Sequence, residues 1–283
     1  MEIKSLGGIP FTEIHKAFTR AFIDYELPPM SIDQLRQMLS RRGLKQELSM
    51  GAFVDGEIVS FTLNGIDQWD GMLTAYDTGT ATIKEYRGQG LARKIFNETV
   101  PVLKEAGVAQ YLLEVLQHNE KAVNLYKGLG FEVIREFDYF STEIENLKVN
   151  SRINLDVEIR KLEIPSLEEI ETFWDFKPAW QNSLDSINRT PHSFLAFGAY
   201  LKEELIGYGI TEFDSGDITQ LSVKRAFRRK GVGTALLRQL IELIPIATLK
   251  VINTDSSELS MLRFLKSVNL EISGKQFEMI KAL

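Results

Sequence analysis

Apolar and polar positions follow two different periods along the first half of the chain. Apolar residues recur at helical spacing over residues 14–22, and Ser31 starts a second helical stretch that ends near Gly43. Two β-like runs, residues 50–54 and 58–63, flank Asp55-Gly56, a dipeptide typical of a tight hairpin. Further on, the pattern predicts a strand at 73–83, a helix at 90–105, a strand at 111–115, a helix at 120–127 and a strand at 131–134.

The second half of the chain repeats this order of elements. The pattern predicts strands at 157–159, 195–200, 205–213, 218–223 and 249–252, and helices at 166–174, 231–243 and 259–267. A polar stretch within residues 142–154 separates the halves. We therefore expect domains at 1–143 and 155–283 with a linker at 144–154, each domain having an α/β (α+β) fold.

Each half contains a glycine loop of the same design between a β-like run and an amphipathic helix. The loops obey Arg-x-x-Gly-x-(Gly/Ala) and occupy residues 87–92 and 228–233. Such a loop directs successive backbone N–H groups toward an anion at a helix N-terminus, and its small residues let a phosphate approach the backbone. The repetition predicts two phosphate-binding domains of common design.

Composition narrows the classes of protein to consider. The 283 residues can form two domains, each with its own core. No apolar run is long enough to span a bilayer and no signal peptide is evident, so no membrane partner is expected. The chain has no cysteine, which excludes disulfides and an acyl-cysteine intermediate and fits a cytoplasmic location. The net charge of -6 argues against nucleic-acid binding, and the three scattered histidines predict no metal site.

A second signature follows the first loop. It consists of Leu113-Glu114-Val115, Asn119, Ala122, Leu125-Tyr126 and Leu129-Gly130-Phe131. With both motifs in order, the chain resembles the GNAT superfamily of acyl-CoA-dependent N-acyltransferases, as a tandem pair. The resemblance implies a mixed, mostly antiparallel twisted sheet flanked by helices in each half, and acetyl-CoA as cosubstrate.

The resemblance also implies which residues contact acetyl-CoA. In the first half they are Thr82, Ile83, Lys84, Arg87, Gly88, Gln89, Gly90, Leu91, Ala92, Asn119, Ala122 and Tyr126. Asn119 is in addition a natural N-cap, because it directly precedes a predicted helix. Weaker contacts are expected in the second half from Val223, Arg228, Arg229, Lys230, Gly231, Val232 and Gly233.

Acyl transfer to an amine requires a base for the amine proton and an acid for the departing thiolate. The resemblance implies that Tyr126 is the acid, since a neutral phenol can hand a proton to sulfur. Glu114 and Asp77 are alternative bases, and a water relay would also serve. Without a cysteine, the acetyl group should pass directly to a primary amine in a ternary complex. The acceptor is expected to be a small amine or a peptide or protein N-terminus, and the oligomeric state stays open.

The second half departs from the family pattern. Leu265 stands where Tyr126 stands in the first half, and Lys250 is expected to take the place of Glu114. We therefore expect this half to bind CoA weakly or to have a structural role. A group of aromatic residues there could line an acceptor pocket or pack in the core: Phe173, Trp174, Phe176 and Trp180.

Other functions remain to be weighed. A dinucleotide-binding oxidoreductase is disfavoured because Arg93 occupies the third glycine position of that motif. A P-loop kinase lacks its Gly-Lys-(Ser/Thr). The serious alternative is a non-catalytic acyl-CoA-binding sensor or interaction protein on the same scaffold.

Overall fold

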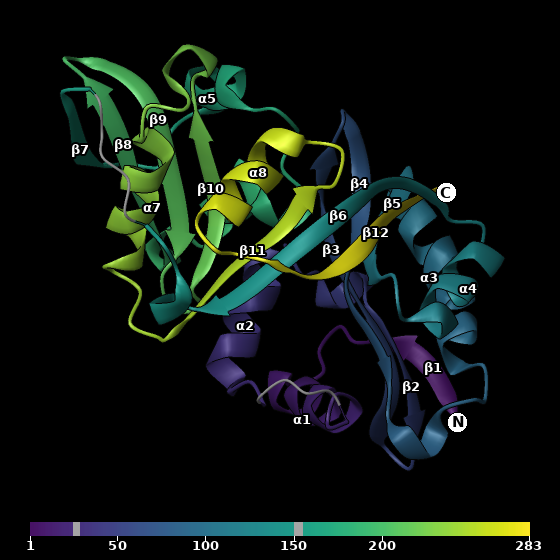
Figure 1. Ribbon diagram of the computed structural model, residues 1–283. Helices are drawn as coiled ribbons and strands as arrows, with labels where there is room; N and C mark the ends of the chain where they lie inside the picture. The colour runs from purple at the N-terminus through teal and green to yellow at the C-terminus, as the bar shows by residue number, and fades with distance from the viewer. Residues whose placement is uncertain (25–28, 150–154) are drawn as a thin grey trace. The chain divides into compact units, whose positions relative to one another are not determined.

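The computed structural model describes residues 1–24, 29–149 and 155–283 (Figure 1). The chain divides into two compact units, Met1–Ile134 with Glu278–Leu283, and Arg135–Phe277. The predicted linker is described only over residues 144–149, because residues 150–154 lie outside the described part. The expected division into domains 1–143 and 155–283 differs from these units and remains a prediction.

The first unit is built on a mixed sheet. β1 through β4 are antiparallel neighbours, and β4 pairs with β5 in parallel. Beside β5 lies the end of the last strand, where the Leu283 backbone N–H donates to Ala109 O at 2.9 Å. The strands are β1 (Glu2–Ser5), β2 (Met50–Val54), β3 (Glu57–Trp69), β4 (Met72–Thr82), β5 (Gln110–Leu116) and β12 (Ile272–Ala282).

Helices cover both faces of this sheet (Figure 1). On one face, α1 (Phe11–Ala21) and α2 (Ile32–Arg41) bury their apolar stripes against Phe61 and Leu63 of β3. The other face is covered by α3 (Leu91–Glu105) and α4 (Glu120–Gly128). Leu91 and Ile95 of α3 pack there against β2 and β3. Both faces of this sheet are thus buried under helices.

The second unit has the same plan. Its strands are β6 (Glu132–Glu143), β7 (Val157–Leu162), β8 (Phe194–Leu201), β9 (Glu204–Glu212), β10 (Asp217–Val223), β11 (Thr248–Asp255) and the first part of β12. One face carries α7 (Val232–Ile241) and α8 (Leu259–Ser267), whose Leu237 and Leu265 share a core cluster. The opposite face carries α5 (Leu167–Ile170) and α6 (Leu184–Arg189). The predicted α/β fold with a mixed, mostly antiparallel sheet is confirmed.

Several elements differ from the sequence pattern, and among them β1 and α6 were not expected at all. β6 continues to Glu143, although a strand was expected only over residues 131–134. β12 was not expected, because charged residues interrupt its alternation. The helix predicted at 166–174 ends at Ile170 and continues as a single 3-10 turn, Glu171–Phe173. Thr172 and Phe173 are poor helix formers, and Phe173 turns into the core instead.

None of the helices in the described ranges is long and apolar enough to cross a membrane.

Candidate active site

The site in the first unit forms where two parallel strands part. β4 and β5 pair only as far as Tyr76 and Leu112. Directly after this point β4 has a bulge, since Asn64 lies opposite Asp77 and Leu63 opposite Gly79. A bulge bends its strand and re-aims side chains. The gap between the strands is therefore flanked by Asp77 on β4 and Glu114 on β5.

Tyr126 reaches this gap from α4. The Asn119 side chain caps that helix by accepting from the Ala122 backbone N–H at 3.2 Å, so the N-cap prediction is confirmed. The Tyr126 hydroxyl donates to Asp77 Oδ2 at 2.9 Å. Its ring is 9% exposed and packs edge-on against Phe131, with ring centroids 5.5 Å apart. The structure thus brings the predicted acid into contact with one of the two candidate bases.

Asp77 is held by three donors. Its Oδ1 accepts from the Gly79 backbone N–H at 2.9 Å, and its Oδ2 accepts from the hydroxyls of Thr80, at 2.8 Å, and Tyr126. Burial among protein atoms raises the pKa of Asp77, although part of the side chain stays accessible. The three hydrogen bonds act in the opposite direction, because they favour the charged form.

Glu114 has a different partner. The Tyr76 hydroxyl donates to Glu114 Oε2 at 2.7 Å. Burial, with the Glu114 charge second, raises the pKa of Tyr76 well above its usual value, so this phenol stays protonated. Tyr76 was not among the predicted site residues, and its only sequence signal was its place on the strand directly before Asp77.

The two tyrosine–carboxylate pairs lie on opposite faces of the sheet. Neighbouring residues of a strand point to opposite sides, so Tyr76 and Asp77 diverge. Tyr76 pairs with Leu112, and Glu114 lies two residues further on the same face. Tyr126 comes from α4, so the Asp77 pair lies on the side of α3 and α4. The Glu114 pair therefore lies on the side of α1 and α2.

The first glycine loop leaves room for an anion. Gly88 and Gly90 have φ of 77° and 72°, and a Cβ added at either would meet no atom within 4 Å. Gly90 is the N-cap of α3, whose first backbone N–H groups have no acceptor within the helix. Open space, available donors and the helix dipole together fit a phosphate group.

The side chain of Arg87 contacts protein groups. Its guanidinium donates to Thr82 O at 3.0 Å and Ala21 O at 2.9 Å, and pairs with Asp24 at 2.9 Å. Lys84 also pairs with Asp24, at 3.3 Å. Hydrogen bonds from both cations, Lys84 first, lower the pKa of Asp24. These contacts join the end of α1 to the loop, a role that no sequence motif indicated.

The other predicted contact residues lie around the loop. The Ile83 backbone N–H donates to Val59 O at 2.9 Å, and its side chain is 1% exposed. The Thr82 and Ser60 hydroxyls are 2.7 Å apart. Leu91 is a core residue, while Gln89 and Ala92 lie in the loop and the first turn of α3. Contact of these residues with a cosubstrate remains a prediction.

The second loop reproduces the first in detail. The Arg228 guanidinium donates to Val223 O at 2.8 Å and Phe173 O at 3.2 Å. It also pairs with Asp175 at 2.7 Å, while Arg225 lies 3.4 Å from the same carboxylate. Gly231 is the N-cap of α7 with φ of 88°, and Lys230 lies over the Phe227 ring. Arg229 has φ of 62° where the first loop has Gly88. Val232 is buried in the first turn of α7, followed by Gly233.

The strand register corrects one correspondence between the halves. β10 pairs with β11 at Asp217 and Lys250, as β4 pairs with β5 at Tyr76 and Leu112. Lys250 therefore corresponds to Leu112, and the expectation that it replaces Glu114 is wrong. Spacing along the sequence alone could not show this, because β11 has an irregularity between Val251 and Thr254 that β5 need not share.

In the second unit, two apolar residues occupy the places that Asp77 and Tyr126 have in the first. Ile218 precedes the β10 bulge as Asp77 precedes the β4 bulge. The Leu270 backbone N–H donates to Leu265 O, as Phe131 N–H donates to Tyr126 O. Leu265 thus corresponds to Tyr126, as its place in the sequence suggested. Neither Ile218 nor Leu265 can exchange a proton.

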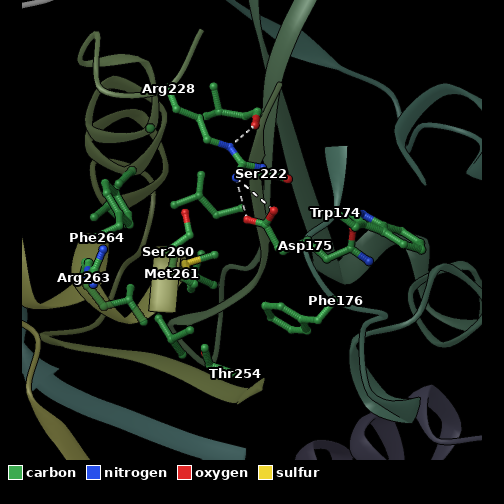
Figure 2. Close-up of a pocket in the computed structure, with 18 of the residues that line it drawn as sticks. Trp174, Asp175, Phe176, Ser222, Arg228, Thr254, Ser260, Met261, Arg263 and Phe264 are labelled. Carbon is green, nitrogen blue, oxygen red and sulfur yellow. Dashed lines mark hydrogen bonds and ion pairs between the residues drawn. The ribbon is translucent and has the colours of Figure 1, made fainter. Parts of the chain in front are cut away.

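A cavity of about 690 Å³ opens at this place in the second unit. Trp174 and Phe176 line it, whereas Phe173 and Trp180 are buried in the core. Of the four aromatic residues singled out in the sequence, two therefore line a cavity and two pack in the core. Figure 2 shows Phe176 and Trp174 on one side, with Ser260, Met261 and Phe264 of α8 on the other. The Arg228–Asp175 pair lies between them.

Potential metal ligands do not gather in the described part of the chain, where no group of three or more histidine, aspartate and glutamate side chains could hold an ion.

Comparison with known proteins supports this architecture. A 59-residue stretch is 41% identical to N-alpha-acetyltransferase 30 of Schizosaccharomyces pombe, covering 21% of this chain and 39% of that protein. A 52-residue stretch is 46% identical to thialysine N-epsilon-acetyltransferase of Mus musculus, covering 18% and 31%. These matches span well under half of either relative. A tandem GNAT protein from the clavulanic acid biosynthesis pathway has the same fold, with a TM-score of 0.73 over 99% of this chain and 98% of that one, at 11% identity.

The sequence model of the acetyltransferase (GNAT) family matches in both halves, at residues 11–131 and 157–266. Each matched range contains one glycine loop, the parting strands beside it and the helix that follows. The two units are therefore copies of one architecture, and the chain belongs to the GNAT family of acetyltransferases.

Proposed function

We propose that the first unit transfers an acetyl group from acetyl-CoA directly to a primary amine. The observation that carries this proposal is the pair of tyrosine–carboxylate contacts on opposite faces of the parting strands, Tyr126–Asp77 and Tyr76–Glu114. Acetyl-CoA supplies an activated thioester whose thiolate needs a proton on leaving. The acceptor amine must lose one. Two proton-transfer groups on opposite sides of one gap meet both needs.

Tyr126 acts as the acid. Its hydroxyl is fixed by Asp77, which accepts its hydrogen bond. When Tyr126 gives its proton to sulfur, the resulting phenolate regains a proton from solvent before the next turnover. Asp77 positions the acid through the hydrogen bond that it accepts.

Glu114 acts as the base. Both oxygens of Asp77 already accept hydrogen bonds, three in total, so Gly79, Thr80 and Tyr126 occupy this carboxylate. Glu114 is half-buried on the other face and is oriented by Tyr76. It can take the amine proton directly or through water.

The first glycine loop holds the phosphates of acetyl-CoA through its backbone N–H groups. The open space around Gly88 and Gly90 fits this role. Because Arg87 is engaged by Thr82, Ala21 and Asp24, it shapes the loop more than it pairs with phosphate.

The acceptor is a small amine or a peptide N-terminus. The two matched relatives are named as N-alpha- and N-epsilon-acetyltransferases, which supports an amine in general terms. The absence of cysteine fits direct transfer and a reducing cytoplasm.

Tyr126→Phe tests the proposal. We expect turnover, measured as thiol release from acetyl-CoA with a panel of primary amines, to fall by about 10²-fold or more, the range of a lost general acid. Acetyl-CoA affinity, measured by calorimetry, should change little, because the ring and its packing on Phe131 remain.

Tyr111→Phe is the matched control. Tyr111 is another buried tyrosine on the same face, and its hydroxyl bonds to Asn64. We expect it to keep most of the turnover. If Tyr126→Phe were as active as the wild type, the chemistry assigned to Tyr126 would be refuted. If no amine released thiol although acetyl-CoA bound, the chain would be the non-catalytic acyl-CoA sensor.

A further inference from the structure

Thr80 lies on β4 three residues after Asp77 and belongs to the same hydrogen-bond network. Residues three apart on a regular strand point to opposite faces of a sheet. The β4 bulge shifts this alternation by one residue, because Asp77 lies opposite Asn64 while Thr80 lies opposite Thr62, only two residues away on β3. Thr80 therefore points to the same face as Asp77, where its hydroxyl donates to Asp77 Oδ2 at 2.8 Å.

Two hydroxyls donate to the same oxygen of Asp77, that of Thr80 and that of Tyr126 at 2.9 Å. The Thr80 hydroxyl is also 3.1 Å from Thr62 Oγ1, so its single proton has two acceptors within reach. Burial raises the pKa of Asp77, and among the hydrogen bonds that lower it the one from Thr80 has the largest effect. Thr80 thus stabilises the charged carboxylate more than Tyr126 or Gly79 does.

The two hydroxyl donors differ once the acid has reacted. In the proposed reaction the O–H bond of Tyr126 breaks and an S–H bond forms on the departing thiolate. Tyr126 then no longer donates to Asp77 Oδ2, and its phenolate oxygen lies beside that carboxylate. A charged oxygen that is largely shielded from water is unfavourable without a hydrogen-bond donor. Thr80 remains as a donor to Oδ2, whereas Gly79 donates to Oδ1.

The second unit provides an internal comparison for this network. β10 has its bulge directly after Ile218, and Leu221 follows three residues later, as Thr80 follows Asp77. Leu221 packs with Ile218 and Leu265 in one core cluster. Because Leu265 takes the place of the acid, all three members of the network are apolar in this unit. The replacement of all three together is what a set of groups with one shared task predicts.

We propose that Thr80 is a positioning residue for the acid of the first unit. Its hydroxyl holds the Asp77 carboxylate, and through it the Tyr126 hydroxyl, in place while Tyr126 gives its proton to sulfur. Thr80 itself exchanges no proton with the substrate. Its effect falls on the chemical step, because Oδ2 depends on Thr80 most once Tyr126 has lost its proton. This inference rests on the proposed acetyl transfer and deepens it.

Thr80→Val tests the inference, because it keeps the shape of the side chain and removes the hydroxyl. We expect kcat for thiol release from acetyl-CoA, measured with the amine panel, to fall by about 10- to 100-fold, the range for one hydrogen bond to a charged group. The KM for acetyl-CoA should change little, since the lost interaction acts mainly in the transition state. Thr80→Ser, which restores a hydroxyl, should recover most of the turnover.

A spectroscopic measurement separates positioning from a merely structural role. Carbon-13 NMR titration of labelled aspartate carboxyls should give a higher pKa for Asp77 in Thr80→Val than in the wild type, because the charged form loses a hydrogen bond. Thr80→Ser should titrate like the wild type. The other charged or titratable side chains that act electrostatically with Asp77 are common to all three proteins: Arg42, Tyr76, Tyr111 and Tyr126.

Thr78→Val is the matched control. Thr78 is buried on β4, and its hydroxyl donates to Leu63 O at 3.1 Å instead of to Asp77. We expect this variant to lose stability but to keep kcat and the pKa of Asp77. Circular dichroism and thermal melting establish that the variants fold. If Thr80→Val does not fold, Thr80→Ala removes the same hydroxyl with a smaller side chain.

Three results would overturn the inference and leave the proposed function standing. They are a wild-type kcat in Thr80→Val, an equal loss of kcat in Thr78→Val, and an unchanged pKa of Asp77 in Thr80→Val. Absence of thiol release from the wild-type chain with every amine would instead refute the proposed function, and with it the role given to Thr80.

Discussion

Asp77 shows how a single residue combines opposing electrostatic effects. Burial raises its pKa, while hydrogen bonds from Thr80, Tyr126 and Gly79 lower it. Because the net shift is upward, the folded protein holds this proton more tightly than the unfolded chain. The carboxyl therefore favours the folded state at acid pH, and that contribution is lost as the pH rises through the folded pKa.

Removing one hydrogen-bond donor should shift the pKa of Asp77 by a measurable amount. In Tyr126→Phe the charged form of Asp77 loses a hydrogen bond, so we expect its pKa to rise further. Carbon-13 NMR titration of labelled aspartate carboxyls measures this shift. Above the pKa, the variant should be less stable than the wild type by about 1.5–3 kcal/mol, and the difference should shrink on acidification. A titration of Asp77 at lower pH in the variant would contradict this assignment.

The arginine of each glycine loop makes the same set of contacts in both units. Arg87 contacts the end of α1, and Arg228 contacts residues 173–175. In both units an arginine joins a loop to two backbone carbonyls and one carboxylate, Asp24 or Asp175. A second cation, Lys84 or Arg225, pairs with the same carboxylate. The arginine of the glycine-loop motif is thus part of the apo fold.

Arg87→Gln should therefore destabilise the protein without any ligand present. Losing the hydrogen bonds to Thr82 O and Ala21 O should lower the free energy of unfolding by about 1–2 kcal/mol, measured by urea denaturation. Exposed Lys94 in α3 provides the control, and Lys94→Gln should change stability little. If Arg87 acted only on phosphate, the ligand-free Arg87→Gln protein would be as stable as the wild type.

At the scale of the whole molecule, each unit contains strand residues from the other half of the sequence. The first unit includes Glu278–Leu283, and the second begins at Arg135 within β6. Met279 is fully buried, and Leu283 bonds to Ala109 beside β5. The last six residues of the chain are therefore part of the core and sheet of the first unit.

Deleting residues 278–283 should weaken the first unit. We expect a lower melting temperature and weaker acetyl-CoA binding, because β5 loses a neighbour and the core loses Met279. Met279→Ala alone should lower the free energy of unfolding by about 2–5 kcal/mol. Lys281→Gln, at a half-exposed position, should change it by much less. An unaltered melting temperature after the deletion would contradict this assignment of the C-terminus.

The sequence by itself determined features that depend on a residue and its near neighbours. Asp55 and Gly56 adopt φ of 49° and 84°, as a tight hairpin requires, and Ser31 and Gln34 form the capping box at α2. The glycine loops precede α3 and α7 where the motif placed them. Each of these signals comes from residues that are close together in the sequence, so it can be recognised without knowledge of the fold.

Only the tertiary structure decided which distant groups meet. Tyr126 and Asp77 are 49 residues apart, and Tyr76 and Glu114 are 38 apart; strand register and the β4 bulge bring each pair together. The strand register likewise shows that Lys250 corresponds to Leu112 and not to Glu114. Side-chain packing leaves a cavity that Leu265 lines. The hydrophobic alternation of β12 is too weak to predict a strand from its own sequence. It forms a strand because neighbouring strands provide hydrogen-bond partners for its backbone N–H and C=O groups. Pairing and packing depend on residues far away in the sequence, and local propensity does not contain that information.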